Sequence, residues 1–167
     1  LTDWRNQNME YFLIQFVATP ERTSSWMKNV LFKKNDQLLF IIKTDEKLVG
    51  HFGFKNLTAN DVLLDNAMRG SRGGHPKLLT FAGKELVNWL IQMFSVKRVD
   101  AYVMAENVAS IMMNKQIGFQ GWHKYPLSKE LSDSGINWKM GTKNGLSPES
   151  RYCYNSEIIT NEWDYHS

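Results

Sequence analysis

A glycine-rich segment at residues 69–77 has the residue types needed to bind an anion. Gly70, Gly73 and Gly74 let the backbone adopt positive φ and approach a ligand closely. A long segment with helical periodicity follows, and the first turn of a helix offers unpaired N–H groups at the positive end of its dipole. This combination suits a phosphate or a pyrophosphate. Taken alone, the segment is equally consistent with a plain connection between two elements.

Basic side chains add to the anion-binding character of this segment, namely Arg69, Arg72, His75 and Lys77. They could contact a pyrophosphate or a further phosphate group. The segment is not a P-loop, because no Gly-Lys-Ser/Thr ends it. The dinucleotide-binding pattern also fits poorly, since a hairpin pattern precedes the segment and no second mononucleotide-binding half follows.

Two side chains near this segment have the chemistry of a general base. His51 lies between apolar neighbours, and an imidazole titrates in the useful pH range. Asp65 precedes the turn and could draw a proton directly or through water. The alternative for each is structural, as a hydrogen-bonded histidine or a turn-stabilising carboxylate. No group of His, Asp and Glu has a convincing metal spacing, so we expect no metal.

Hydrophobic periodicity and turn residues predict the elements that position these side chains. The predicted helices are Asp3–Phe16, Thr19–Lys34, Lys77–Phe94 and Asn107–Gln116, and the predicted strands are Leu38–Lys43, Leu48–Phe54, Asp61–Asn66, Lys97–Met104 and Arg151–Ile158. We interpret Tyr125–Lys143 as a long loop with one strand at Ile136–Met140, and Asn161–Ser167 as a frayed tail. This order predicts a mixed α/β (α+β) domain with an antiparallel front half and one parallel pair of strands joined by a helical crossover.

Composition restricts the class of protein. The chain has 167 residues, of which 43% are apolar, and this fits one domain over residues 1–167 with a real core. A net charge of +3 is too weak to indicate nucleic acid as a partner. Cys153 is the only cysteine, so neither an internal disulfide nor a cysteine-based zinc site can form. Without a membrane-spanning apolar run or a signal segment, we expect a cytoplasmic protein with no membrane partner.

Three segments resemble the GNAT superfamily of acyl-CoA-dependent N-acetyltransferases. LVGHFGF at Leu48–Phe54 is similar to the third strand of the family, and RGSRGGHPKLLTFAGKELVNWL at Arg69–Leu90 resembles its cofactor loop and following helix, in a variant with a proline after the glycines. NVASIMMNKQIGF at Asn107–Phe119 resembles its next helix, from an asparagine to a final Gly-Phe. The likeness is firm from Leu38 to Phe119 and looser at residues 3–30.

The resemblance implies a twisted, mostly antiparallel sheet flanked by helices, with a V-shaped opening that binds acetyl-CoA or another short acyl-CoA as co-substrate. The pantetheine amides would pair with Asn66, Ala67 and Met68, and Asn107 would stand beside the pantetheine arm. The pyrophosphate would sit on the turn formed by Arg72, Gly73, Gly74, His75, Pro76 and Lys77.

The resemblance also shows where this chain departs from its relatives. The usual acid of the family is a tyrosine seven residues after the asparagine, and this position holds Asn114. An amide cannot act as an acid at neutral pH, although Asn114 could hydrogen-bond the sulfur or the carbonyl. The family's first strand has no counterpart here, so we expect it upstream of Leu1 in a longer chain. Members are often dimers, which makes a homodimer the expected oligomer if the chain self-associates.

The implied reaction is attack of a primary amine of a small molecule on the acyl-CoA thioester. The form of the glycine-rich turn points to an amino sugar on a nucleotide carrier as the acceptor, by family analogy alone. Trp122, His123, Tyr125 and Trp138 could line the acceptor pocket, or could simply pack. Two alternatives stay open: acetylation of a protein N-terminus or ribosomal protein, and a catalytically silent acyl-CoA-binding domain.

Overall fold

A computed structural model describes residues 1–165. The helices are α1 (Thr2–Gln7), α2 (Pro20–Trp26), α3 (Leu78–Phe94) and α4 (Val108–Ile117), with a 3-10 turn at Met9–Tyr11 and a π-helical turn at Met27–Leu31. The strands are β1 (Ile14–Gln15), β2 (Leu38–Thr44), β3 (Lys47–Lys55), β4 (Asp61–Arg69), β5 (Arg98–Met104), β6 (Gln120–Ser132), β7 (Gly135–Met140) and β8 (Tyr152–Ile159). They form an eight-stranded sheet in the order β1-β7-β6-β8-β5-β4-β3-β2, in which only β4 and β5 pair in parallel. The predicted mixed fold is confirmed.

The main core lies between one face of the sheet and helices α3 and α4. Phe52 and Phe54 of β3 project to this face together with Val62 and Leu64 of β4, and all four are buried. They pack against the apolar stripe of α3 that Leu86, Val87 and Leu90 form. Since side chains alternate along a strand, the residues between them project to the opposite face. His51 and Asp65 therefore lie on the face of the sheet that α3 does not cover.

Strand β4 contains a bulge where it passes β3. His51 pairs with Met68 and Gly53 pairs with Asp65, so that one residue of β3 faces two residues of β4, Asn66 and Ala67. Asn66 takes a left-handed conformation with φ 54, which an asparagine tolerates better than most residues. A bulge of this kind bends its strand and interrupts regular pairing.

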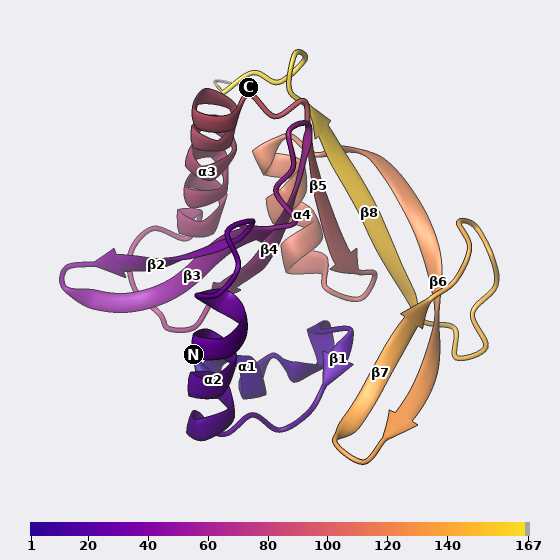
Figure 1. Cartoon of the computed structure of the whole chain (residues 1–167). Helices are drawn as coiled ribbons and strands as arrows, with labels where there is room; N and C mark the ends of the chain where they lie inside the picture. Colours follow the sequence, from indigo (N-terminus) through magenta and orange to yellow (C-terminus); the bar gives the residue numbers. More distant parts are fainter. Residues whose placement is uncertain (166–167) are drawn as a thin grey trace.

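Strands β4 and β5 separate beyond this bulge. Their parallel ladder covers Asp61–Leu64 against Arg98–Ala101 and includes none of the later residues of either strand. In Figure 1 the two arrows start together and spread apart toward their tips, with α1 and α2 beside the open end. The open end leaves residues 65–69 of β4 unpaired on the side of β5. This is the V-shaped opening that the resemblance implies.

The predicted helix at Asp3–Phe16 is wrong beyond Gln7. The side chain of Asn6 bonds to both the N–H and the carbonyl of Ala18, and Asn8 Nδ2 donates to the carbonyl of Trp4. Such side-chain bonds to the backbone compete with helical bonding. The chain then pairs Ile14 and Gln15 with β7. The second predicted helix is confirmed at its start, with Thr19 as its N-cap and Pro20 in its first turn, but it passes into a π-helical turn and ends at Leu31 rather than Lys34.

The predicted long loop at Tyr125–Lys143 is wrong in its first half, where Tyr125–Ser132 belongs to β6, whereas the strand predicted at Ile136–Met140 is confirmed as β7. The two strands form a hairpin. The ladder runs from Leu127–Met140 to Ser132–Gly135. The outer half of β6 is exposed on both faces, so it has no apolar alternation for sequence reasoning to detect. The predicted frayed tail is wrong up to Tyr165, since Trp163 packs against the main core and its Nε1 donates to the carbonyl of Ile117. Residues 166 and 167 of that prediction lie outside the described chain.

Candidate active site

The glycine-rich turn wraps around a single side chain. The guanidinium of Arg69 donates to the carbonyl oxygens of Gly73, His75 (2.9 Å) and Pro76 (3.2 Å). Gly73 and Gly74 have φ 148 and 65, values that a residue with a Cβ adopts only under strain. Arg69 therefore shapes the turn by binding its carbonyls, and this use leaves it less available to a ligand than a free surface arginine.

The turn presents a run of unpaired amides. Within residues 1–165, the backbone N–H groups of Arg72, Gly73, Gly74 and His75 donate to no protein acceptor. The next amide, of Lys77, donates to Nδ1 of His75 at 3.1 Å, so this nitrogen stabilises the turn before α3 and is not free to act as a base. Consecutive free N–H groups at a helix start form an anion-binding concavity. The turn can thus bind the negative group that its sequence predicts.

A cavity of about 870 Å³ opens on the face of the sheet away from α3. One wall is the sheet at the separated ends of β4 and β5, and the other wall consists of α1, α2 and the segments that follow them. Pockets for drug-sized ligands have volumes of ~300–1,000 Å³, and this cavity lies within that range. His51, Asp65, Asn66 and Met68 line this cavity among the residues predicted for the site.

His51 combines burial with a defined tautomer. Its side chain is 5% exposed, its ring stacks on Trp4, and Nδ1 lies 2.6 Å from the carbonyl oxygen of Asn66. A carbonyl only accepts, so Nδ1 carries the proton and the lone pair remains on Nε2. Burial lowers the pKa of His51 below its ordinary 6.5, and the bond to Asn66 opposes this shift in part. The ring is therefore neutral at pH 7, as a general base requires.

Asp65 lies in the same cavity but is already paired. Its Oδ2 accepts from Lys55 Nζ at 2.9 Å and from Asn66 Nδ2 at 2.9 Å. Both contacts occupy the same oxygen, so Oδ2 is not free to approach a substrate amine. As a base, Asp65 is the weaker of the two predicted candidates on this geometry.

Of the three predicted asparagines, Asn107 and Asn114 lie outside the lining of this cavity. Asn107 is the N-cap of α4, where its Oδ1 accepts from the N–H of Ser110 at 3.1 Å. Asn114 is 5% exposed within α4. The structure thus brings His51 and Asp65 together and leaves Asn114 outside the group.

The cavity also contains residues that sequence reasoning missed. Arg5 of α1, Arg22 of α2 and Tyr102 of β5 all line it. Burial, and then the nearby Asp100, raise the pKa of Tyr102, so its phenol stays protonated and can donate. The signal for Tyr102 was available, since it alternates with the buried Ala101 and Val103 on the strand after the crossover helix. No pattern in the sequence around Arg5 or Arg22 indicates that the two side chains lie close together.

The aromatic lining differs from the one predicted. None of Trp122, His123, Tyr125 and Trp138 belongs to the cavity wall. Trp122 instead packs on the main core, and its Nε1 donates to the carbonyl of Phe119 at 3.3 Å. The cavity takes its aromatic rings from the first 26 residues, namely Tyr11, Phe12, Phe16 and Trp26, and from Phe54 and Tyr102 of the sheet.

Cys153 lines the cavity as well, but it is a poor nucleophile. Its side chain is fully buried, and burial raises its pKa to about 12. The thiolate is the reactive form of cysteine, and at pH 7 it is almost absent at this position. Across residues 1–165, no group of three His, Cys, Asp or Glu side chains could hold a metal ion.

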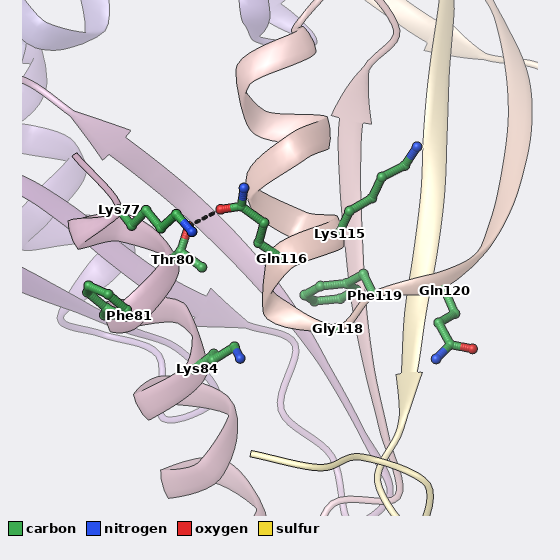
Figure 2. A pocket seen from close by; sticks show the side chains of 9 residues that line it. All are labelled: Lys77, Thr80, Phe81, Lys84, Lys115, Gln116, Gly118, Phe119 and Gln120. Atoms are coloured by element: carbon green, nitrogen blue, oxygen red, sulfur yellow. Dashed lines mark hydrogen bonds between the residues drawn. The ribbon is translucent and has the colours of Figure 1, made fainter. Parts of the chain in front are cut away.

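A second cavity, of about 550 Å³, lies between α3 and the end of α4. Figure 2 shows Lys77, just before α3, and Phe81 and Lys84 of α3 across from Lys115 and Phe119. The Thr80 hydroxyl donates to Gln116 Oε1 at 3.2 Å. Because Lys77 also belongs to the glycine-rich turn, this basic groove extends along α3 from the free amides of the turn.

No helix of the described chain is both long and apolar enough to cross a membrane.

The sequence matches the family model of the acetyltransferase (GNAT) domain over residues 1–120. The chain belongs to the GNAT acetyltransferase family. The predicted enzyme class, an acyl-CoA-dependent N-acetyltransferase, is therefore confirmed. No protein of curated function matches the sequence significantly.

Solved structures of GNAT enzymes share this fold. Spermidine N-acetyltransferase from Vibrio cholerae, in complex with CoA and spermine, aligns with TM-score 0.69 and 9% identity over 99% of this chain and 89% of its own. A GNAT-family acetyltransferase from Bacillus anthracis aligns with TM-score 0.66 and 17% identity over 96% and 86%. The N-acetyltransferase PseH of Campylobacter jejuni, in complex with acetyl coenzyme A, aligns with TM-score 0.54 and 15% identity over 83% and 78%. At these identities the likeness concerns the fold.

Proposed function

We propose that this GNAT enzyme transfers an acetyl group from acetyl-CoA to a primary amine of a small molecule, with an amino sugar on a nucleotide carrier as the preferred acceptor. One observation carries the proposal. Four consecutive free amides, at Arg72–His75, lie at the start of α3 and next to the open end of β4 and β5. This arrangement suits a pyrophosphate on the turn and a thioester arm directed into the cavity that contains His51.

In this proposal the turn from Arg72 to Lys77 holds the pyrophosphate of CoA. The unpaired edge of β4 at Ala67 and Met68 bonds the pantetheine amides, and Asn107 lies on the far side of the arm. The carbonyl of Asn66 is already bonded to His51, so Asn66 contributes through its bulge rather than by pairing with pantetheine. The lysines of the groove between α3 and α4 would face the phosphorylated end of the co-substrate.

The reaction is direct transfer. The acceptor enters as an ammonium ion and gives one proton to Nε2 of His51. Its nitrogen then attacks the thioester carbonyl carbon, a C–N bond forms, and the C–S bond breaks. The second proton leaves nitrogen as the amide forms, while the thiolate of CoA gains one, so one proton is released overall. Support for direct transfer comes from Cys153, whose raised pKa makes an acyl-cysteine intermediate unfavourable.

The proton for the departing thiolate comes from Tyr102 in this proposal. Its phenol lines the cavity on β5, at the separated end of the V. With a raised pKa it remains protonated until it donates. Asn114, at the usual position of the family's tyrosine, would at most hydrogen-bond the carbonyl or sulfur.

The shape of the site favours a small acceptor over a protein N-terminus. Helices α1 and α2 with their following segments wall the cavity opposite the sheet, and a folded protein would need an open groove to present its terminus there. Spermidine is the second candidate acceptor, because the structure of the Vibrio cholerae spermidine enzyme covers 99% of this chain.

Calorimetric titration with acetyl-CoA, followed by assay of thiol release with amine acceptors, tests the proposal. Gly74→Ala forces a Cβ to within 2.8 Å of Thr44 and imposes φ 65 on an alanine, so the turn shifts and binding should weaken roughly tenfold or more. Gly121→Ala is the matched control, because Gly121 has φ 62 but lies on β6. Failure of the parent chain to bind acetyl-CoA would contradict the proposal, and saturable binding without turnover would favour a silent acyl-CoA-binding domain.

A further inference from the structure

The charges that line the large cavity are strongly unbalanced. Four cationic side chains line it, from Arg5, Arg22, Lys34 and Lys55, against the single carboxylate of Asp65 among the described lining residues. Asp65 is paired with Lys55 at 2.9 Å. Within residues 1–165, the other three cations have no carboxylate at ion-pair distance. The cavity wall therefore carries a net positive charge, although Asp65 also attracts Arg5 beyond ion-pair distance.

Arg5 and Arg22 are held near each other by one aromatic ring. The guanidinium carbons lie 4.4 Å (Arg5) and 3.6 Å (Arg22) from the centre of the Phe16 ring. Burial, and then the charge of Arg22, lower the pKa of Arg5. The two groups thus repel each other in the free protein, and an anion bound in the cavity near both would reduce this repulsion.

Arg5 also has an unused donor. Its Nη2 donates to the carbonyl of Ile14 at 2.8 Å, while its Nε is buried without a partner in the described chain. A buried N–H that lacks an acceptor is costly, and arginine binds phosphate oxygens through such paired N–H groups. Because Nε is enclosed, a ligand phosphate would reach this guanidinium through Nη1, which makes no hydrogen bond to a described residue.

These arginines face the wall that contains the proposed base. Arg5 follows Trp4 in α1, and the Trp4 ring stacks on His51 with a centroid distance of 6.0 Å. An acceptor whose amine reaches His51 can therefore extend toward α1 and α2. Tyr11 and Trp26 line the same side and offer rings for a sugar or base to stack on.

We infer that the acceptor carries a phosphate group, and that Arg5 and Arg22 bind this phosphate and so orient the amine toward His51. The inference rests on the proposed function, which it deepens by naming the acceptor's charge. A nucleotide-linked or phosphorylated amino sugar meets the requirement. A polyamine does not, since every further ammonium group would meet the same net positive charge.

Binding of uridine diphosphate to CoA-saturated protein tests the inference without any turnover. Excess CoA fills the turn and the groove along α3, so the titration reports on the remaining anion site. We expect saturable binding that weakens about tenfold or more in Arg22→Gln, the loss expected for one charge-assisted contact. Lys97→Gln, which removes an exposed cation at the paired end of β5, should leave it unchanged.

Two outcomes of this titration overturn the inference: no saturable binding of uridine diphosphate, or equal binding by the parent and Arg22→Gln. Arg5→Gln should also weaken binding, but Arg5 packs on Phe12 and Phe16, so its fold must be checked by thermal melting. Arg22 lies exposed in the first turns of α2, and its variant keeps the test valid if Arg5→Gln does not fold.

Acetylation of glucosamine 6-phosphate, glucosamine and spermidine separates the inference from the proposed function. We expect the highest kcat/KM for the phosphorylated sugar, and loss of its advantage over glucosamine in Arg22→Gln. A clear preference for spermidine would overturn the phosphate site but leave acetyl transfer to amines intact. Absence of acetyl-CoA binding and of turnover with every amine would contradict the proposed function, while the difference in uridine diphosphate binding between the parent and Arg22→Gln would still decide on the anion site.

Discussion

At the scale of single residues, the site depends on how burial and hydrogen bonds assign a role to each ionisable group. His51 is neutral because it is buried, and its tautomer follows from the carbonyl of Asn66. Asp65, a few ångströms from Lys55, stays a paired carboxylate. Two groups that look equally suited as a base in the sequence therefore differ in their contacts in the folded protein, where Nε2 of His51 keeps its lone pair and Oδ2 of Asp65 is already bonded.

His51 should control the acidic limb of the pH profile. The base must be neutral, so the rate falls as the pH drops through the pKa of His51, which burial sets below 6.5. We therefore expect kcat/KM to begin its fall at a lower pH than it would with an ordinary imidazole as the base. His51→Gln should lower kcat by ~10²-fold or more and remove this limb. Asp65→Asn serves as the comparison, and a larger loss there would transfer the role to Asp65.

Tyr102 should affect the chemical step more than binding. Tyr102→Phe removes the phenol proton but keeps the ring, and the 44% exposed side chain leaves the fold little changed. We expect kcat to fall by ~10²-fold with little change in the KM for acetyl-CoA. The loss should be smaller with an acyl donor whose thiol is more acidic, because its thiolate leaves without an acid. An unchanged kcat would remove Tyr102 from the mechanism.

At the scale of elements, the site is built where regular pairing stops. The bulge at Asn66 and Ala67 turns β4 away from β5, and the next strand residues lead directly into the glycine-rich turn. Helix α1 completes the site from the other side, since Trp4 lies between His51 and Gly70. A substitution in the glycine-rich turn can therefore shift side chains of α1 and β3.

Gly70→Ala tests this coupling. A Cβ at this position would lie 1.8 Å from the Trp4 ring, so the ring must move and the stack on His51 must loosen. Overpacking of this kind costs typically about 1–3 kcal/mol. We expect a lower midpoint in thermal unfolding and a lower kcat, with acetyl-CoA binding largely kept because the free amides begin at Arg72. Gly145→Ala, with its Cβ no closer than 3.1 Å to any atom, is a control for stability.

At the scale of the whole molecule, the two ends of the described chain contact elements that are far from them in sequence. The chain after β8 returns to α4, where Trp163 packs on the core and its Nε1 bonds to the carbonyl of Ile117 at 3.3 Å. The first residues return to the far end of the sheet through the pairing of β1 with β7. Both ends of the described chain thus stabilise elements that are remote in sequence.

Trp163→Ala should destabilise the protein without changing the chemistry. The side chain is half-buried, so we expect a loss of about 2 kcal/mol in the free energy of unfolding, below the ~3–5 kcal/mol of a fully buried aromatic ring. Denaturant unfolding measures the loss, and kcat at low temperature should match that of the parent. Parental stability would mean that the tail packs only weakly on α4.

The sequence by itself determined the elements whose residues carry a local signal. Strands β2 to β5 and helices α3 and α4 have apolar periodicity or terminal residues such as Gly118, and the glycine-rich turn has its own conformational requirement. These features predicted the crossover and an anion-binding turn, whereas the open sheet and the acyl-CoA site were implied by the resemblance to the GNAT family. They could not predict the β6–β7 hairpin, because its outer half is exposed and carries no pattern.

Only the tertiary structure decided which residues meet. Arg5 and Arg22 come from different helices and share the ring of Phe16, and Tyr102 reaches the same cavity from β5, eighty residues further on. The balance between His51 and Asp65 likewise depends on Lys55, Asn66 and burial. Charge, desolvation and hydrogen bonding act through space over a few ångströms, so they arise only after the chain has brought these side chains together.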